Sequence, residues 1–304
     1  MKKKNRAVKT KMTKAEKKET LTGYLFVAPY LIFFLIFTGI PFLVAIGLSF
    51  VNVKYITQLD NLKFVGLRNF EKIFASKEIM QSLWRTFEYS LVYVPLIMIV
   101  GFGLAVILNK GVYLKNTLRS MMFLPYVSNM VAVAVIFKVL LGTNGPLVQG
   151  LRSLGFDPPI LLQDIKLALP TVAVIAVWKS VGLNMVTYLG ALQDVPKELL
   201  EAAQIDGANR WQRVRHVIIP MISPTTFFLL ISSITGSLQN FTVIQSLTDG
   251  GPGQATTVMS VNIVRTAFSK YETSLASAMA LIMFVIVMAI TLIQWRGQKK
   301  WVNY

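Results

Sequence analysis

The chain has 304 residues, of which 54% are hydrophobic and only 15% are charged. This composition is too apolar for an ordinary soluble domain and places the chain in a bilayer. With no cysteine and a single histidine, His216, the sequence provides neither a zinc site nor a Cys/His catalytic pair, so we expect no metal site and no enzyme chemistry in this chain.

Six apolar segments are long enough to cross about 30 Å of hydrocarbon, which takes roughly 20 helical residues. In chain order they are residues 25–50, 89–108, 120–141, 167–192, 217–241 and 274–295. Each is far longer than the alternating signal of a β-barrel strand, which spans roughly ten residues. Lys138 and Lys179 are the only formal charges inside them. The sequence therefore predicts an all-α polytopic membrane protein with six transmembrane helices.

The N-terminal segment is a basic tail followed by a retained span. The first apolar run is too long for the hydrophobic region of a signal peptide, and no small-residue cleavage site follows it. Residues 1–23 hold nine Lys and Arg residues, which we interpret as a topology anchor that touches anionic lipid headgroups rather than as a nucleic-acid-binding tail.

The orientation follows from where Lys and Arg fall along the chain. The segments on the same side as the N-terminus hold nineteen of these residues and the opposite segments hold ten. Because cytoplasmic loops carry the excess, we predict that both termini are cytoplasmic. The chain then divides into a basic tail (1–23), a six-helix transmembrane domain (24–296) with a cytoplasmic loop at 193–217, and a short cytoplasmic tail (297–304).

The loop at 193–217 is charged and amphipathic. Asp194 and Pro196 mark a helix start, and Gly207 supplies a left-handed stop because it has no Cβ. A second helix then runs to Pro220. At helical spacing its side chains form two faces: one holds Trp211, Val214, Arg215 and Ile218, and a more exposed one holds Arg210 and Arg213.

The first of these helices is suited to docking another protein. It carries Glu198 and Glu201 one turn apart, beside the small residues Ala202 and Ala203. Small residues allow close approach of a partner surface, and carboxylates offer it charge-assisted hydrogen bonds. The alternative is an interfacial helix that only rests on lipid, although two acids near anionic headgroups are ill-suited to that role.

Three stretches of this sequence resemble a known family. "EAAQIDG", followed nine residues after Gly207 by "VIIP", resembles the EAA motif of the membrane subunits of binding-protein-dependent ABC importers. Val217 and Ile219 stand where that motif has Ile and Leu, and Pro220 is in register. "FVGLRNFEKIF" (64–74) and "LTDGGPGQATTV" (247–258) are similar to the carbohydrate-uptake permeases of that superfamily, which include maltose, glycerol-phosphate and multiple-sugar importers.

The resemblance implies a type I ABC importer permease that pairs with a second, homologous permease, with the "GGP" segment similar to the first-type partner. It also implies a cytoplasmic ATPase dimer, which would bind ATP and Mg²⁺, and an extracytoplasmic sugar-binding protein; this chain would carry no cofactor. The expected ATPase-coupling residues are Glu198, Glu201, Ala202, Ala203, Asp206 and Gly207. Among them, Glu201 would make the polar contact and Gly207 would fix the turn. No phosphate-binding loop is visible in the sequence itself.

The sugar path is expected among aromatic, amide and charged side chains at membrane depth, because a sugar ring offers an apolar face and an edge of hydroxyls. The candidates are Trp178, Lys179, Asn184 and Tyr188 on the fourth span and Gln239 and Asn240 on the fifth. The alternative is that these groups only hydrogen-bond neighbouring helices. Lys179 is expected to face a cavity or a partner, since an unpaired charge at membrane depth is costly.

The outer loops 51–88 and 242–273 are long, and the second contains glycines that permit an adaptable backbone. We expect Gly250, Gly251 and Pro252 to face the binding protein, the alternative being solvated linkers. Other function classes fit less well: a secondary transporter needs carboxylates within spans, an embedded enzyme needs paired reactive groups, and a channel needs a symmetric filter. Within ABC importers, another polar solute is the alternative substrate.

Overall fold

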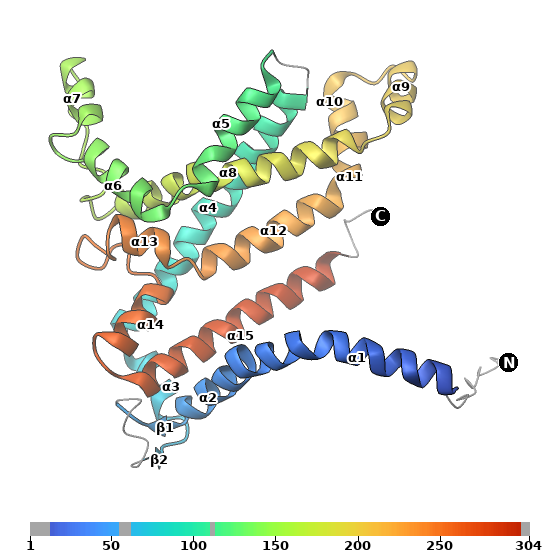
Figure 1. The fold of residues 1–304 in the computed structure, drawn as a ribbon. Helices are drawn as coiled ribbons and strands as arrows, with labels where there is room; N and C mark the ends of the chain where they lie inside the picture. The colour runs from blue at the N-terminus through green and yellow to red at the C-terminus, as the bar shows by residue number, and fades with distance from the viewer. Residues whose placement is uncertain (1–12, 55–61, 110–112, 299–304) are drawn as a thin grey trace.

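The computed structural model describes residues 13–54, 62–109 and 113–298, and they form a helical membrane protein (Figure 1). Four helices are long and apolar enough to span a bilayer, and two bent helix pairs bring the number to six if each pair is one span. The predicted all-α fold class is confirmed. Residues 1–12 of the predicted basic tail and residues 299–304 lie outside the described residues.

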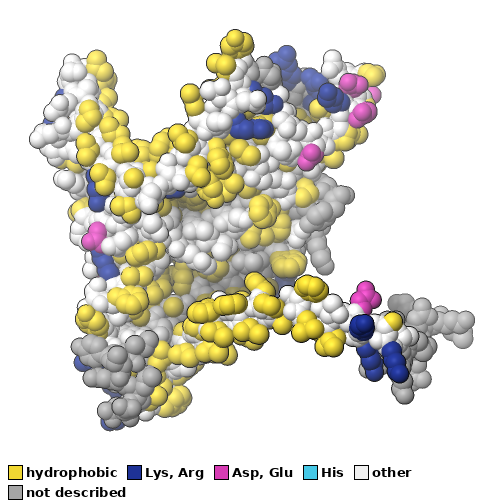
Figure 2. Space-filling model, viewed as in Figure 1, with side chains coloured by type: hydrophobic (Ala, Val, Ile, Leu, Met, Phe, Trp, Pro, Cys, Tyr) yellow, Lys and Arg dark blue, Asp and Glu magenta, His cyan; other side chains and the backbone are white. Residues whose placement is uncertain are grey.

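The first span is one long helix that stands apart from the rest of the chain. It consists of α1 (Lys14–Phe34), the π-helical η1 (Leu35–Gly39) and α2 (Ile40–Ser49). Its helix begins well before the predicted span, so the predicted boundary at residue 23 is not a structural break. Its main contact with another span is that of α2 with the C-terminal helix, and Figure 2 shows hydrophobic side chains along the length of this span. These side chains are available for lipid or for another chain.

A small outer cap follows the first span. β1 (Val51–Asn52) pairs antiparallel with β2 (Lys63–Phe64), and α3 (Arg68–Ala75) leads into α4 (Lys77–Asn109). The Asn69 amide donates to the carbonyls of Ser49 and Val51 at 2.9 Å each. The loop predicted at 51–88 is thus partly helical, because α4 starts twelve residues before the predicted second span.

The third span is not the single helix that the apolar run predicted. It is divided into α5 (Lys115–Val127) and α6 (Met130–Leu140), which meet at 98°. Asn129 caps α6 by accepting from the Val131 N–H at 2.8 Å. The Ser128 hydroxyl and the Lys179 ammonium donate to the freed carbonyls of Leu124 and Tyr126, both at 3.0 Å. These hydrogen bonds cap the C-terminus of α5 and the N-terminus of α6 and so stabilise the break. The sequence did not predict it, because the apolar run continues through both helices.

The fourth span lies at the centre of the bundle. α7 (Pro146–Ser153) precedes α8 (Ala168–Gln193), which packs against α4 and α5. Close approach depends on glycines: a Cβ on Gly182 would collide with the Met122 carbonyl oxygen of α5, and one on Gly101 of α4 would lie 2.9 Å from the Asn184 Cβ. Small residues at such contacts let membrane helices pack backbone against backbone.

The second half of the chain begins with α9 (Lys197–Ile205), α10 (Arg210–Arg213), the π-helical η3 (Val214–Ile218) and α11 (Ile219–Met221). Residues Arg210–Met221 meet α12 (Ser223–Leu238) at 69°, so the fifth span is also bent. α13 (Thr242–Leu247), α14 (Met259–Phe268) and α15 (Thr273–Gln298) complete the fold. In Figure 1, α9 and α10 lie at one end of the bundle and α13 and α14 at the other.

Each end of the bundle has its own buried hydrophobic cluster. The first includes Tyr89, Leu169, Ile244 and Val258, so it joins α4 and α8 to α13 and the segment before α14. The second, at the α9 end, includes Leu108, Met185, Leu192 and Ile222. The two segments that connect spans four to five and five to six are therefore anchored on α4 and α8.

Candidate functional sites

α9 presents its acidic and small residues to the outside. Glu198, Glu201 and Ala202 are exposed, and Ala203 is half-buried. Figure 2 shows acidic side chains over α9, with basic side chains beside them. The predicted docking residues are accessible on the described surface.

The turn after α9 is fixed by the chain itself. Gly207 has φ +81°, the left-handed conformation that the sequence predicted. The N–H of Ala208 donates to the Ala203 carbonyl at 2.9 Å, and the N–H of Asp206 donates to Ala202 at 3.0 Å. Asp206 thus supports the turn through its main chain, and these backbone hydrogen bonds close the C-terminal end of α9.

A capping box starts the second helix. The Gln212 N–H donates to Asn209 Oδ1 at 2.9 Å, and the Asn209 N–H donates to Gln212 Oε1 at 2.8 Å. Across the turn, Arg213 Nη1 donates to Gln204 Oε1 at 3.0 Å. These contacts set the angle between α9 and α10 without help from another chain.

The predicted faces of the second helix are partly wrong. Val214 and Ile218 are half-buried as expected, but Trp211 and Arg215 of the same predicted face are exposed, and Arg213 is half-buried. Trp211 and Arg213 lie in α10, and η3 begins only at Val214. From that residue on, the hydrogen bonds of a π-helix run from i to i+5. The wider turn shifts the side chains away from the positions that a period of 3.6 residues assigns.

The four α8 candidates for the sugar path lie in different surroundings. Trp178 is 46% exposed and meets the Phe137 ring edge-on at 5.2 Å. Lys179 binds the Tyr126 carbonyl and lies 5.8 Å from the centre of that residue's ring. Asn184 and Tyr188 are buried. Lys179 therefore neutralises part of the negative end of α5, a local role that the sequence left open.

Asn184 has an unmet hydrogen-bonding group. Its Oδ1 is buried and has no hydrogen-bond partner. Tyr188, one turn further along α8, packs edge-on against Phe102 at 5.5 Å. A buried amide oxygen without a donor is expensive in a protein interior, so this position is suited to a conformation or a ligand that supplies one.

The two candidates that follow the end of α12 differ from each other. Gln239 is exposed and lines a cavity of about 720 Å³ between α12, α14 and α15. Asn240 is engaged inside the chain: its Nδ2 donates to the Tyr89 hydroxyl at 2.7 Å, and its carbonyl accepts from Ser260 Oγ at 2.7 Å. In this conformation Asn240 joins α4, α12 and α14, as the alternative reading of these amides expects.

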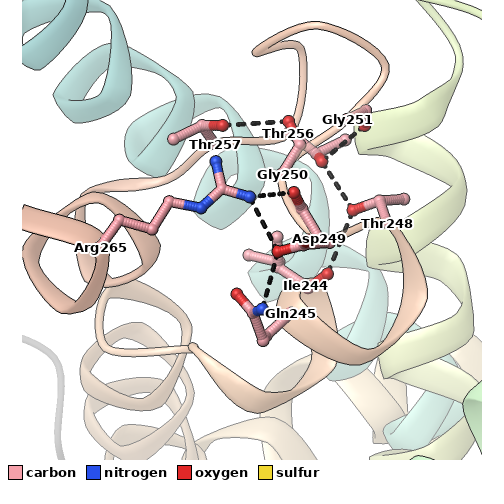
Figure 3. Close-up of polar contacts among 9 residues, drawn as sticks. All are labelled: Ile244, Gln245, Thr248, Asp249, Gly250, Gly251, Thr256, Thr257 and Arg265. Carbon is pink, nitrogen blue, oxygen red and sulfur yellow. Dashed lines mark hydrogen bonds and ion pairs between the residues drawn. The ribbon is translucent and has the colours of Figure 1, made fainter. Parts of the chain in front are cut away.

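The segment between α13 and α14, which the sequence analysis places in an outer loop, is a compact polar network (Figure 3). The Arg265 guanidinium donates to both the main-chain carbonyl and the carboxylate of Asp249, and Gln245 Nε2 donates to the same carboxylate at 2.7 Å. The Thr256 hydroxyl donates to the Gly251 carbonyl at 2.8 Å, and Thr257 to Gly250 at 3.0 Å.

The electrostatics of this segment favour the charged form of Asp249. Hydrogen bonds from Arg265, its positive charge and a donor from Gln245 hold the pKa of the Asp249 carboxyl below its usual range, and the more distant Lys138 acts in the same direction. Among the described residues, no group of three or more His, Cys, Asp or Glu side chains could hold a metal ion. The contacts shown by these groups hold the segment together.

Comparisons with known proteins decide the family. The model of the family described as "Binding-protein-dependent transport system inner membrane component" matches residues 93–296. The chain belongs to this family. It is 36% identical to the probable ABC transporter permease YesP of Bacillus subtilis, over 99% of this chain and 97% of the relative. It is 30% identical to AmyD of Thermoanaerobacterium thermosulfurigenes, a probable permease for starch degradation products, over 89% and 91% of the two chains.

A solved structure agrees with the fold. A chain of a bacterial ABC transporter involved in the import of the acidic polysaccharide alginate superposes with a TM-score of 0.82 at 25% identity, covering 95% of this permease and 99% of that chain. The protein is therefore a permease subunit of an ABC importer, an inner-membrane component and not an enzyme. The predicted family and permease architecture are confirmed.

Sequence reasoning missed two exposed apolar side chains of the permease. Ile205, at the end of α9, is 86% exposed, and Trp211 is 68% exposed. Large exposed apolar residues of this kind are typical of surfaces that contact another molecule or lipid. The signal was available, because Ile205 follows Ala202 at a spacing that shares one helix face.

Two glycines of the segment between α13 and α14 lie in the left-handed region. Gly250 and Gly253 have φ +75° and +58°, and they lie beside the buried residues Ala255, Thr256 and Thr257. In this structure their lack of a Cβ is used to form a turn.

Proposed function

We propose that this permease translocates a sugar or oligosaccharide that an extracytoplasmic binding protein delivers, with energy from a cytoplasmic ATPase dimer. The observation that carries the proposal is α9: an exposed helix with Glu201 and Ala202 outward, closed by an internally fixed turn. A docking element needs such a geometry, because a fixed turn passes force to the spans on either side instead of absorbing it.

The sugar class rests on two kinds of support. AmyD is named for starch degradation products, and the superposed structure belongs to a transporter for alginate. This chain adds aromatic and amide groups at membrane depth, the chemistry that sugars require. Another polar solute remains the alternative substrate. We propose Trp178, Lys179, Asn184, Tyr188, Gln239 and Asn240 as the path, with Asn184 the foremost because of its unpaired oxygen.

The proposed mechanism is mechanical coupling. Closure of the ATPase around ATP and Mg²⁺, both bound outside this chain, would move α9. Glu201 would hold the contact, with Glu198 beside it, and Ala202 and Ala203 would allow close packing. Motion would pass to α8 directly and to α12 through the bent connection at residue 222. A few kcal/mol of difference in docking energy between two states is enough to shift their populations.

The proposed assembly contains a second, homologous permease. Both termini and the loop at 193–217 would be cytoplasmic, with the basic tail 1–23 and the tail 297–304 against anionic lipid. Gly250, Gly251 and Pro252 would face the binding protein on the other side. The excess of Lys and Arg on the N-terminal side supports this orientation.

The test is a charge reversal on α9. The permease would be coexpressed with its partner permease and ATPase, and Glu201→Lys compared with Glu71→Lys, an exposed acid on α3 at the other end of the bundle. Loss of a charge-assisted contact of about 1.5–3 kcal/mol predicts a drop of roughly 10-fold or more in ATPase stimulation by the sugar-loaded binding protein. The Glu71 variant should respond like wild type.

A different result would contradict the proposed ATP-driven coupling. If the chain purifies alone, transports sugar into liposomes without ATP and ignores the Glu201 change, ATP-driven coupling is wrong and a secondary carrier replaces it.

A further inference from the structure

A cavity of about 440 Å³ lies where α4 and α8 end, beneath α9 and α10. Its lining is mostly apolar, with Phe102, Val106, Leu192 and Ile218 among its members, and its polar members are Asn109, Arg210 and Arg213. The last turn of α4 and the end of α8 reach this level, so the cavity lies at a membrane boundary if these helices span the bilayer. An apolar wall with a cationic rim at that depth matches a phospholipid, which has acyl chains on one side of its phosphate and water on the other.

The two arginines, Arg210 and Arg213, have no acidic partner among the described residues. Arg213 uses Nη1 to hold Gln204, while its buried Nε has no hydrogen-bond partner. Arg210 is exposed at the rim. A guanidinium binds phosphate well, because its planar group can donate two parallel hydrogen bonds to two phosphate oxygens.

We propose that this cavity binds one anionic phospholipid, with acyl chain on the Phe102–Val106 wall and phosphate between Arg210 and Arg213. The inference goes beyond sugar transport and needs only that α4 and α8 span the membrane. Because Arg213 also fixes the turn between α9 and α10, the bound lipid stiffens the proposed coupling segment. The fraction of anionic lipid in the surrounding bilayer then controls the rigidity of the connection between α9 and α10.

Three other occupants can be told apart from this one. A free phosphate shares the headgroup chemistry but leaves the apolar wall uncovered. A neighbouring subunit covers the cavity in the assembled complex and excludes lipid. A neutral lipid fits the wall but not the rim. The experiment therefore tests the apolar wall, the arginines of the rim and the access of lipid in the assembled complex separately.

The experiment uses the complex of this permease with its partner permease and ATPase, exchanged into detergent, incubated with dioleoyl phosphatidylglycerol or dioleoyl phosphatidylcholine, and analysed by native mass spectrometry. The variants are Arg210→Gln, Arg213→Gln and Val106→Phe, which fills the wall. The matched control is Arg215→Gln, an exposed arginine of the same segment that is not among the residues lining the cavity.

We expect wild type and Arg215→Gln to retain at least about 5-fold more phosphatidylglycerol than phosphatidylcholine, and Arg210→Gln to lose that preference. Val106→Phe should lower retention of both lipids. Since Arg210 is exposed, its substitution leaves the fold intact, so this variant remains decisive if the others fail to assemble.

Equal retention by wild type and Arg210→Gln overturns the proposal. So does displacement of the lipid by millimolar inorganic phosphate, which would assign the site to a free anion, or exclusion of lipid once the subunits assemble. A complex that assembles and hydrolyses ATP in response to sugar without preferring phosphatidylglycerol disproves only the lipid site. A chain that retains the lipid but never binds an ATPase disproves only the proposed function.

Discussion

The segments on either side of the fifth span, 193–221 at one end and 242–273 at the other, show two different ways of building a connection. Each contains a short helix followed by a left-handed glycine. At Gly250 the space is occupied: a Cβ there would lie 2.5 Å from Thr257 Oγ1 and 3.0 Å from Arg265 Nη1. At Gly207 nothing lies within 4 Å of the same position.

The polar groups of the two segments follow the same division, although both segments expose large apolar side chains, including Phe268 at 73% in the second one. The outer segment buries Thr256 and Thr257 and pairs Asp249 with Arg265. The α9–α10 segment leaves Ile205 and Trp211 exposed. The turn at Gly250 is enclosed by neighbouring side chains, whereas the turn at Gly207 is held by main-chain hydrogen bonds and leaves its outer side open to a partner.

The largest effect is expected when the two glycines are exchanged for alanine. Gly250→Ala adds a left-handed penalty of about 1–2 kcal/mol and overpacking of about 1–3 kcal/mol, so the thermal midpoint of the purified chain should fall by several degrees. Gly207→Ala carries only the first penalty and should leave the midpoint closer to wild type, while weakening ATPase coupling in the complex.

The control for this pair is Gly190→Ala, on the exposed side of α8 without a positive φ and with nothing within 4 Å of the added atom. Its thermal midpoint should match wild type. If Gly207→Ala destabilises the isolated chain as much as Gly250→Ala does, the two segments are equally self-supporting and the comparison fails.

An intermediate effect is expected from Ile205→Ser. Burying an isoleucine side chain at an interface is worth about 1.5–3 kcal/mol, so the permease–ATPase association measured by titration should weaken by roughly 10-fold or more. The isolated chain should unfold as wild type does, because Ile205 is 86% exposed there. Leu154→Ser, at 73% exposure after α7, is the matched control and should change neither quantity. Unchanged association of the Ile205 variant would remove this residue from the interface.

The smallest effect is expected from the pH dependence of the outer segment. The pKa of Asp249 is lowered by Arg265, so its stabilising contribution is complete above the ordinary carboxyl pKa of about 3.9 and is lost as the pH falls through the lower folded value. The stability difference between wild type and Asp249→Asn, measured by thermal unfolding from pH 7 to pH 3, should therefore shrink only below about pH 4. At 66% side-chain exposure the difference should stay below about 1 kcal/mol. A difference that disappears above pH 5 would contradict this assignment.

Much of this permease was decided by the sequence. Long apolar runs predict membrane-spanning helices, because a segment inside the bilayer must satisfy its backbone hydrogen bonds internally. The position of Gly207 predicts a turn, because its lack of a Cβ permits positive φ. The EAA-like stretch predicted an exposed docking helix, and the structure places Glu201 and Ala202 on its outside. These are local properties, which depend on neighbours within one or two turns.

The rest depended on tertiary structure. Tyr126 and Lys179 are 53 residues apart, as Asp249 and Arg265 are 16 apart, and no local pattern brings either pair together. The break of the third span is stabilised by a donor from α8, and Arg213 of α10 reaches back across the turn to Gln204 of α9. Such features follow from which helices pack together, because a freed carbonyl or a guanidinium takes whichever partner the fold brings within reach.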